Sequence, residues 1–136
     1  MNTQQITLVQ QSFAKVLPIA DTAAALFYER LFTLDPSVKH LFKGDLTQQG
    51  YKLMQAIGFV VKGLGRLETI LPTVQSLGKR HQGYGVRTEH YDTVGAALLW
   101  TLEQGLGDGF TPEIKDSWTA AYTLLATVMQ EAAATP

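Results

Sequence analysis

The segment from Leu77 to Gly95 holds most of the aromatic polar chemistry of this chain. It contains His81, His90 and Tyr91, and the third histidine of the chain is His40. The histidines lack the HxxxH or HExxH spacing of a zinc site, and no Ser-His-Asp order is visible. Without a cysteine, the chain has no disulfide, thiolate metal site, iron–sulfur cluster or cysteine nucleophile.

Two further polar side chains stand among apolar neighbours. Tyr28 lies in "AALFYERLF", and Gln49 begins a face that continues with Leu53, Ile57 and Val60. Taken singly, each of these residues has an ordinary structural explanation. A histidine near a helix end is commonly half-exposed and bonded to a carbonyl, a tyrosine in an apolar helix is commonly a core residue, and Gln49 would be a surface amide.

Apolar residues recur with the helical period of 3.6 almost throughout, which predicts an all-α fold. The predicted helices cover about residues 3–17, 21–34, 47–63, 72–82 and 88–104, and a last helix begins near residue 112 and reaches at least Met129, with "EAAATP" expected to fray. Thr47, Thr88 and Thr111 are the expected N-caps of the third, fifth and sixth helices. Pro72 is expected near the start of the fourth helix, which Gly83 ends.

Composition narrows the classes of protein to which the chain can belong. Its 136 residues and 46% hydrophobic content predict one domain, residues 1–136, with a sizeable core. Eleven Lys+Arg against twelve Asp+Glu, with no evident basic block, argue against nucleic acid as a partner. The N-terminus has no signal-peptide pattern, and no segment approaches the roughly 20 apolar residues of a membrane span. We therefore expect a soluble, cytoplasmic protein without a membrane partner.

Several motifs together resemble the globin family, most closely single-domain bacterial globins and the globin domain of flavohaemoglobins. They are "FYERLF", "HLFKGD", "QQGYKLM", "LGKRHQGYGV", "EHYDTVGAALL" and "SWTAAYTLLA", in the order and at the spacings of that family across nearly the whole chain. The resemblance implies a globin fold, a three-over-three helical sandwich enclosing haem b (iron protoporphyrin).

The resemblance also implies roles for individual residues that hold the haem. His81 matches the proximal axial ligand of the iron, and Phe42 matches the phenylalanine that packs flat on the porphyrin. Leu53, Leu77, Val86 and Tyr91 are the other residues expected to bind the cofactor.

On the distal side, Tyr28 and Gln49 match the polar pair of the bacterial branch, and Leu53 matches its apolar gate. A tyrosine hydroxyl and a glutamine amide both donate hydrogen bonds, which are strong to the partly negative oxygen of a ligand in a dry pocket. Tyr28 and Gln49 are therefore the expected catalytic residues, and slow oxygen release is the expected result.

One feature of the family is incomplete in this chain. In the flavohaemoglobin branch, the proximal histidine is bonded to a tyrosine ten residues later and to a glutamate late in the final helix. His81 and Tyr91 keep that spacing, but the glutamate position falls at Ala133, and Glu131 is rotated from it by roughly 200° on a helix. We therefore expect Tyr91 or a backbone carbonyl to orient His81 without help from a carboxylate.

The implied function is reversible binding of oxygen, nitric oxide or another diatomic gas. Conversion of nitric oxide to nitrate is the expected reaction, and because the sequence ends at Pro136 we expect a separate reductase to restore ferrous iron. Oxygen storage or transport is the alternative without turnover. A gas sensor is less favoured because no transmitter domain is attached, and a haem-free helical interaction module is the alternative from another class. A monomer or weak dimer is expected.

Overall fold

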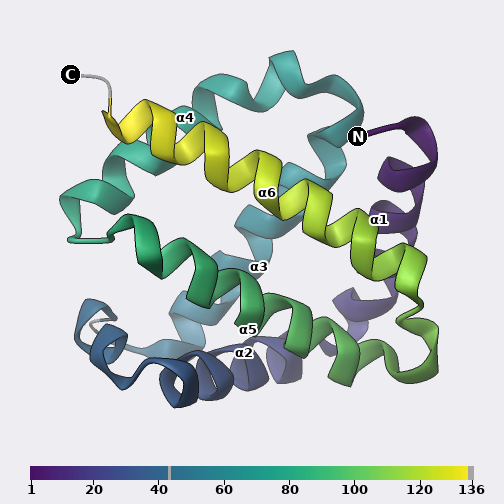
Figure 1. Ribbon diagram of the computed structural model, residues 1–136. Helices are drawn as coiled ribbons and strands as arrows, with labels where there is room; N and C mark the ends of the chain where they lie inside the picture. The colour runs from purple at the N-terminus through teal and green to yellow at the C-terminus, as the bar shows by residue number, and fades with distance from the viewer. Residues whose placement is uncertain (43, 135–136) are drawn as a thin grey trace.

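The computed structural model describes residues 1–42 and 44–134. This part of the chain contains six α-helices and four short 3₁₀ helices (Figure 1). The α-helices are α1 (Thr3–Val16), α2 (Ala20–Leu34), α3 (Leu46–Gly63), α4 (Leu67–Gly83), α5 (Thr88–Leu106) and α6 (Pro112–Ala134). The 3₁₀ helices are η1 (Leu17–Ile19), η2 (Pro36–Leu41), η3 (Leu64–Arg66) and η4 (Gly107–Gly109). These residues include no strand, so the predicted all-α class is confirmed.

The structure corrects three predicted helix starts. Asp45, not Thr47, caps α3, because its carboxylate accepts the backbone N–H of Thr47 at 2.8 Å. Thr88 is the first helical residue of α5 rather than its cap. Helix α4 begins at Leu67, five residues before the expected start, so Pro72 lies inside it.

Packing explains why α4 extends past Pro72. Leu67 packs against the core and Ile70 is buried in it, so the first turns of α4 bury apolar surface. A proline this close to the N-terminus removes only one intrahelical hydrogen bond. The predicted cap of α6 is confirmed, since the Thr111 hydroxyl accepts the N–H of Ile114 at 3.3 Å.

The helices form two layers. Helices α1, α3 and α4 pack against α2, α5 and α6, which is the expected three-over-three sandwich, with α6 lying over both α1 and α4 (Figure 1). None of the helices in the described ranges has the length and apolar character needed to span a bilayer.

The larger of two apolar cores joins α1, α4 and α6. Phe13 and Trp118 contact each other with ring centroids 6.2 Å apart, and the Trp118 indole N–H donates to the Ser12 hydroxyl at 2.8 Å. The smaller core lies between α2, η2 and α5. Its buried members are Phe27, Tyr28, Leu31, Val38 and Ala97.

Candidate functional site

His81 lies in the last turn of α4 and is half-buried. Its Nδ1 atom is 2.7 Å from the carbonyl oxygen of Leu77, one turn earlier. Because a carbonyl oxygen only accepts, Nδ1 of the neutral ring must carry the proton. Nε2 then keeps its lone pair, which is the form in which imidazole binds a metal.

The chain turns back directly after His81. Gly85 adopts a positive φ of 94°, and the N–H of Val86 donates to the carbonyl of His81 at 3.0 Å. Val86 is half-buried close to the histidine. A Cβ atom on Gly85 would stand 3.7 Å from Leu41, so this loop also adjoins η2.

Tyr28 lies in an aromatic environment on α2. Its ring is T-shaped against Phe27 and Phe42, at 5.4 and 5.3 Å between centroids, and stacks on Phe32 at 6.1 Å. Burial raises the pKa of Tyr28 to about 12, so the hydroxyl remains a protonated donor at physiological pH.

Helix α3 meets α2 beside Tyr28. A Cβ atom on Gly50 would stand 2.9 Å from Ala24 Cβ and 3.6 Å from the Tyr28 ring, so the two backbones approach closely there. Gln49 immediately precedes this contact and is half-buried. Leu53, one turn later, packs at the edge of the smaller core that contains Tyr28. The structure thus gathers Tyr28, Gln49 and Leu53 at one end of α3.

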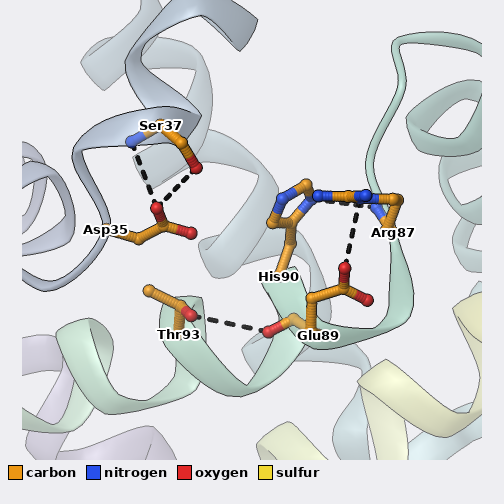
Figure 2. Close-up of polar contacts among 6 residues, drawn as sticks. All are labelled: Asp35, Ser37, Arg87, Glu89, His90 and Thr93. Atoms are coloured by element: carbon orange, nitrogen blue, oxygen red, sulfur yellow. Dashed lines mark hydrogen bonds and ion pairs between the residues drawn. The ribbon is translucent and has the colours of Figure 1, made fainter.

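Phe42 follows η2, and two residues that the sequence analysis did not single out, Asp35 and Ser37, form the start of that 3₁₀ helix. Asp35 accepts hydrogen bonds from the Ser37 hydroxyl at 2.5 Å and the Ser37 N–H at 3.1 Å (Figure 2). Hydrogen bonds from the Ser37 hydroxyl and from the Ser37 N–H, with a smaller contribution from the Arg87 charge, hold the pKa of Asp35 below its usual value.

His90 is the buried member of this group. Its Nδ1 atom accepts the N–H of Arg87 at 2.9 Å, which helps fix the start of α5 near Asp35 (Figure 2). In the sequence, the one usable signal for this role is that His90 lies three residues after Arg87, the N-cap residue of α5. In His90 the Nδ1 atom therefore accepts a hydrogen bond that holds the start of α5. In His81 the Nδ1 atom donates instead, which leaves the lone pair on Nε2.

Tyr91 is half-buried, and its carbonyl accepts the hydroxyl of Tyr122 at 2.6 Å. In the described part of the chain, its own hydroxyl makes no hydrogen bond to His81, whose ring bonds to Leu77 instead. Near the end of α6, Ala132 is buried and Glu131 is exposed. Of the two partners expected for His81, the backbone carbonyl is the one that the structure contains.

The side chains between the two cores suit a flat apolar cofactor. Phe42 and Leu53 pack against the smaller core and Leu77 packs against the larger one, yet all three are only half-buried, as is Val86. An apolar cavity of about 20 Å³ is lined in part by Leu53 and Leu98. Within the described ranges, no group of three or more His, Cys, Asp or Glu could hold a metal. An ion at His81 would need its other ligands from a cofactor, as in haem.

A comparison with protein families matches residues 25–129 to the family described as Globin. The chain belongs to the globin family. This globin is 33% identical over 132 residues to a flavohemoprotein of Vibrio cholerae, with 94% of this chain and 34% of the relative aligned. It is 30% identical over 118 residues to neuroglobin-1 of Oncorhynchus mykiss, with 76% of this chain and 74% of the relative aligned. It spans about a third of the length of the flavohemoproteins it matches.

Solved structures share the fold of this globin. A bacterial globin from Campylobacter jejuni superimposes with a TM-score of 0.85 at 24% identity, covering 97% of this chain and 96% of the other. An engineered carbene transferase and proposed nitric oxide dioxygenase from Rhodothermus marinus gives a TM-score of 0.88 at 22% identity, covering 98% and 94%.

Proposed function

We propose that this globin is a single domain, residues 1–136, that binds haem b with His81 as the axial ligand of the iron. The observation that carries the proposal is the hydrogen bond from His81 Nδ1 to the Leu77 carbonyl. It orients the ring and leaves Nε2 free, as do the hydrogen bonds that metal-binding histidines donate from their other ring nitrogen. Phe42, Leu77, Val86 and the ring of Tyr91 would provide apolar contacts for the porphyrin.

When bound, haem b would supply an iron centre at which diatomic gases bind and at which nitric oxide and oxygen combine to form nitrate. Tyr28 and Gln49 donate hydrogen bonds to the ligand in this pocket. The raised pKa of Tyr28 keeps its proton in place, and Leu53 restricts the space beside the ligand. Relatives named as flavohemoproteins support haem as the cofactor.

Nitric oxide dioxygenation is the proposed reaction, and oxygen storage is its alternative without turnover. Each nitrate formed from nitric oxide and oxygen requires one electron, so sustained activity depends on a reductase. A structural relative that is itself a proposed nitric oxide dioxygenase supports this reaction. Nitric oxide consumption, measured with an electrode with and without a generic reductase, separates the two roles. Consumption that stops after one equivalent even with the reductase would leave storage.

The test of the haem site is the absorption spectrum of His81→Gly with and without imidazole. We expect the wild-type protein to take up haem and show a Soret band, and the variant to lose haem unless imidazole is added. His40→Gly is the matched control, since His40 is exposed. A variant that kept an unchanged five-coordinate ferrous spectrum without imidazole would exclude His81 as the ligand. A colourless wild-type protein would favour a haem-free module.

A further inference from the structure

The formal net charge of −1 conceals a strong separation of charge along the chain. Residues 36–87, which include η2, α3 and α4, contain eight Lys+Arg and two Asp+Glu, a formal net charge of +6. The remaining residues contain three Lys+Arg and ten Asp+Glu, a formal net charge of −7. The expectation of no basic block therefore holds for the overall count of charges but not for residues 36–87.

Tyr84 lies near the end of the basic segment 36–87, next to His81, the candidate haem ligand. Tyr84 is 65% exposed, and its ring centroid is 6.2 Å from that of His81. Lys79 and Arg80, in the last turn of α4, are also exposed. Tyrosine is enriched at protein interfaces, where its ring packs and its hydroxyl stays hydrated.

The surface continues onto η2. The contact between Gly85 and Leu41 brings the α4–α5 loop against η2, where Lys39 is exposed. We call Lys39, Lys79, Arg80 and Tyr84 the Tyr84 surface. Its position is visible in Figure 1, where the end of α4 lies on the same side of the molecule as the segment between α2 and α3.

The basic groups of the Tyr84 surface are not neutralised by carboxylates. In the described ranges, the one ion pair joins Arg87 to Glu89 at 3.2 Å, and it does not involve Lys39, Lys79 or Arg80. Lys39 lies 6.0 Å over the Phe32 ring instead. Uncompensated cations around an exposed aromatic ring attract and orient an acidic partner.

We propose that the Tyr84 surface is the docking site for an acidic redox protein that delivers one electron at a time. The proposal rests on the proposed function, because turnover to nitrate requires an electron source. One electron leaves the cofactor of the partner and reduces ferric iron to ferrous iron, and no atom is transferred. Docking at Tyr84 would place the partner against a ring whose centroid is 6.2 Å from that of His81, the proposed ligand of the iron.

Charge separation favours a compact protein over an extended anionic surface. A membrane or a nucleic acid would extend past the four residues of the Tyr84 surface and also meet acidic residues from the rest of the chain, whose formal net charge is −7. An acidic patch on a small protein matches the Tyr84 surface alone, and a molecule with separated charge rotates to present it. Such binding weakens with salt because the groups are exposed.

The test compares two variants with the same total charge. Lys79→Glu/Arg80→Glu reverses two charges of the Tyr84 surface, and Lys15→Glu/Lys115→Glu reverses two exposed lysines of α1 and α6. The probe is oxidised flavodoxin, an acidic flavoprotein, and its dissociation constant is measured by fluorescence anisotropy at 20 and 300 mM salt. Electron delivery is then measured by stopped flow as the reduction of ferric haem, with uncharged reduced lumiflavin as the reference reductant.

We expect flavodoxin binding to weaken about tenfold or more in Lys79→Glu/Arg80→Glu and by less than about twofold in the control. The lumiflavin rate should be the same in all three proteins. Equal weakening in both variants, or binding that salt does not affect, would overturn the proposal. So would binding to phosphatidylserine vesicles or single-stranded DNA that is lost only in Lys79→Glu/Arg80→Glu while flavodoxin binding is unchanged. The Soret band of the same samples tests haem uptake separately.

Discussion

Gly78 of α4 lies directly on the backbone of Met129 in α6, where a Cβ atom would stand 2.2 Å from the Met129 carbonyl oxygen. This contact sets the distance between the helix that carries His81 and its main packing partner. We expect Gly78→Ala to lower the free energy of unfolding by about 1–3 kcal/mol, because backbone cannot move aside as a flexible side chain can. Urea denaturation measures it. Gly83→Ala in the same helix is the control, since nothing lies within 4 Å of its Cβ position.

Tyr28→Phe removes the proposed donor to the ligand but keeps the ring among its aromatic neighbours. A hydrogen bond to a charged acceptor contributes about 1.5–3 kcal/mol, so oxygen should dissociate faster by about one to two decades. Gln49→Leu should act in the same direction, and the two effects need not add because they share one acceptor. Stopped-flow dissociation rates measure both. Unchanged rates in both variants would mean that these groups do not reach the ligand.

Alkaline pH should destabilise the protein through its buried tyrosines. Burial raises the pKa of Tyr28 to about 12 and also raises the pKa of Tyr91 and Tyr122. The unfolded chain loses these protons near pH 10, so stability is complete below pH 10 and falls as the pH rises toward 12. A shift of two pKa units corresponds to about 2.7 kcal/mol for Tyr28. Denaturant melts from pH 8 to 11 should show this fall, with a smaller slope in Tyr28→Phe.

The iron–histidine stretch of the ferrous protein should lie nearer that of an oxygen-storage globin than that of a peroxidase. The physical reason is that the neutral carbonyl of Leu77 accepts the hydrogen bond from His81 Nδ1–H. A carbonyl acceptor makes imidazole less basic than a carboxylate acceptor would. Resonance Raman spectroscopy measures the stretch. Glu131→Gln should leave it unmoved, because Glu131 is exposed. A peroxidase-like stretch that shifts in this variant would place Glu131 in the proximal network.

Apolar periodicity was sufficient to predict five of the six α-helices to within a few residues, because one face of each is buried. The start of α4 was wrong because Pro72 is a strong local signal, whereas the burial of Ile70 depends on neighbours distant in sequence. The cap of α3 was wrong for a local reason. Asp45 and Thr47 are both good caps, and only the backbone conformation shows which of them accepts the hydrogen bond.

For the candidate site, the sequence predicted positions but not partners. His81, Tyr28 and Gln49 were identified by their place in family motifs, and in the structure Gly50, the residue after Gln49, lies against the Tyr28 ring where α2 meets α3. The choice of Leu77 over Tyr91 as partner of His81 depends on ring orientation, which no spacing specifies. The contribution of His90 and Asp35 near η2 was missed because those residues are 55 positions apart in the chain.

The hydrogen bond between Ser12 and Trp118 joins residues 106 positions apart. It has a consequence for biosynthesis, since α1 leaves the ribosome well before α6, the helix on which it mainly packs. Val9, Phe13 and Val16 are buried in the folded domain, but their apolar face lacks this partner until α6 has been synthesised. The nascent chain therefore completes the larger core only when α6 has emerged, and until then α1 is available to chaperones.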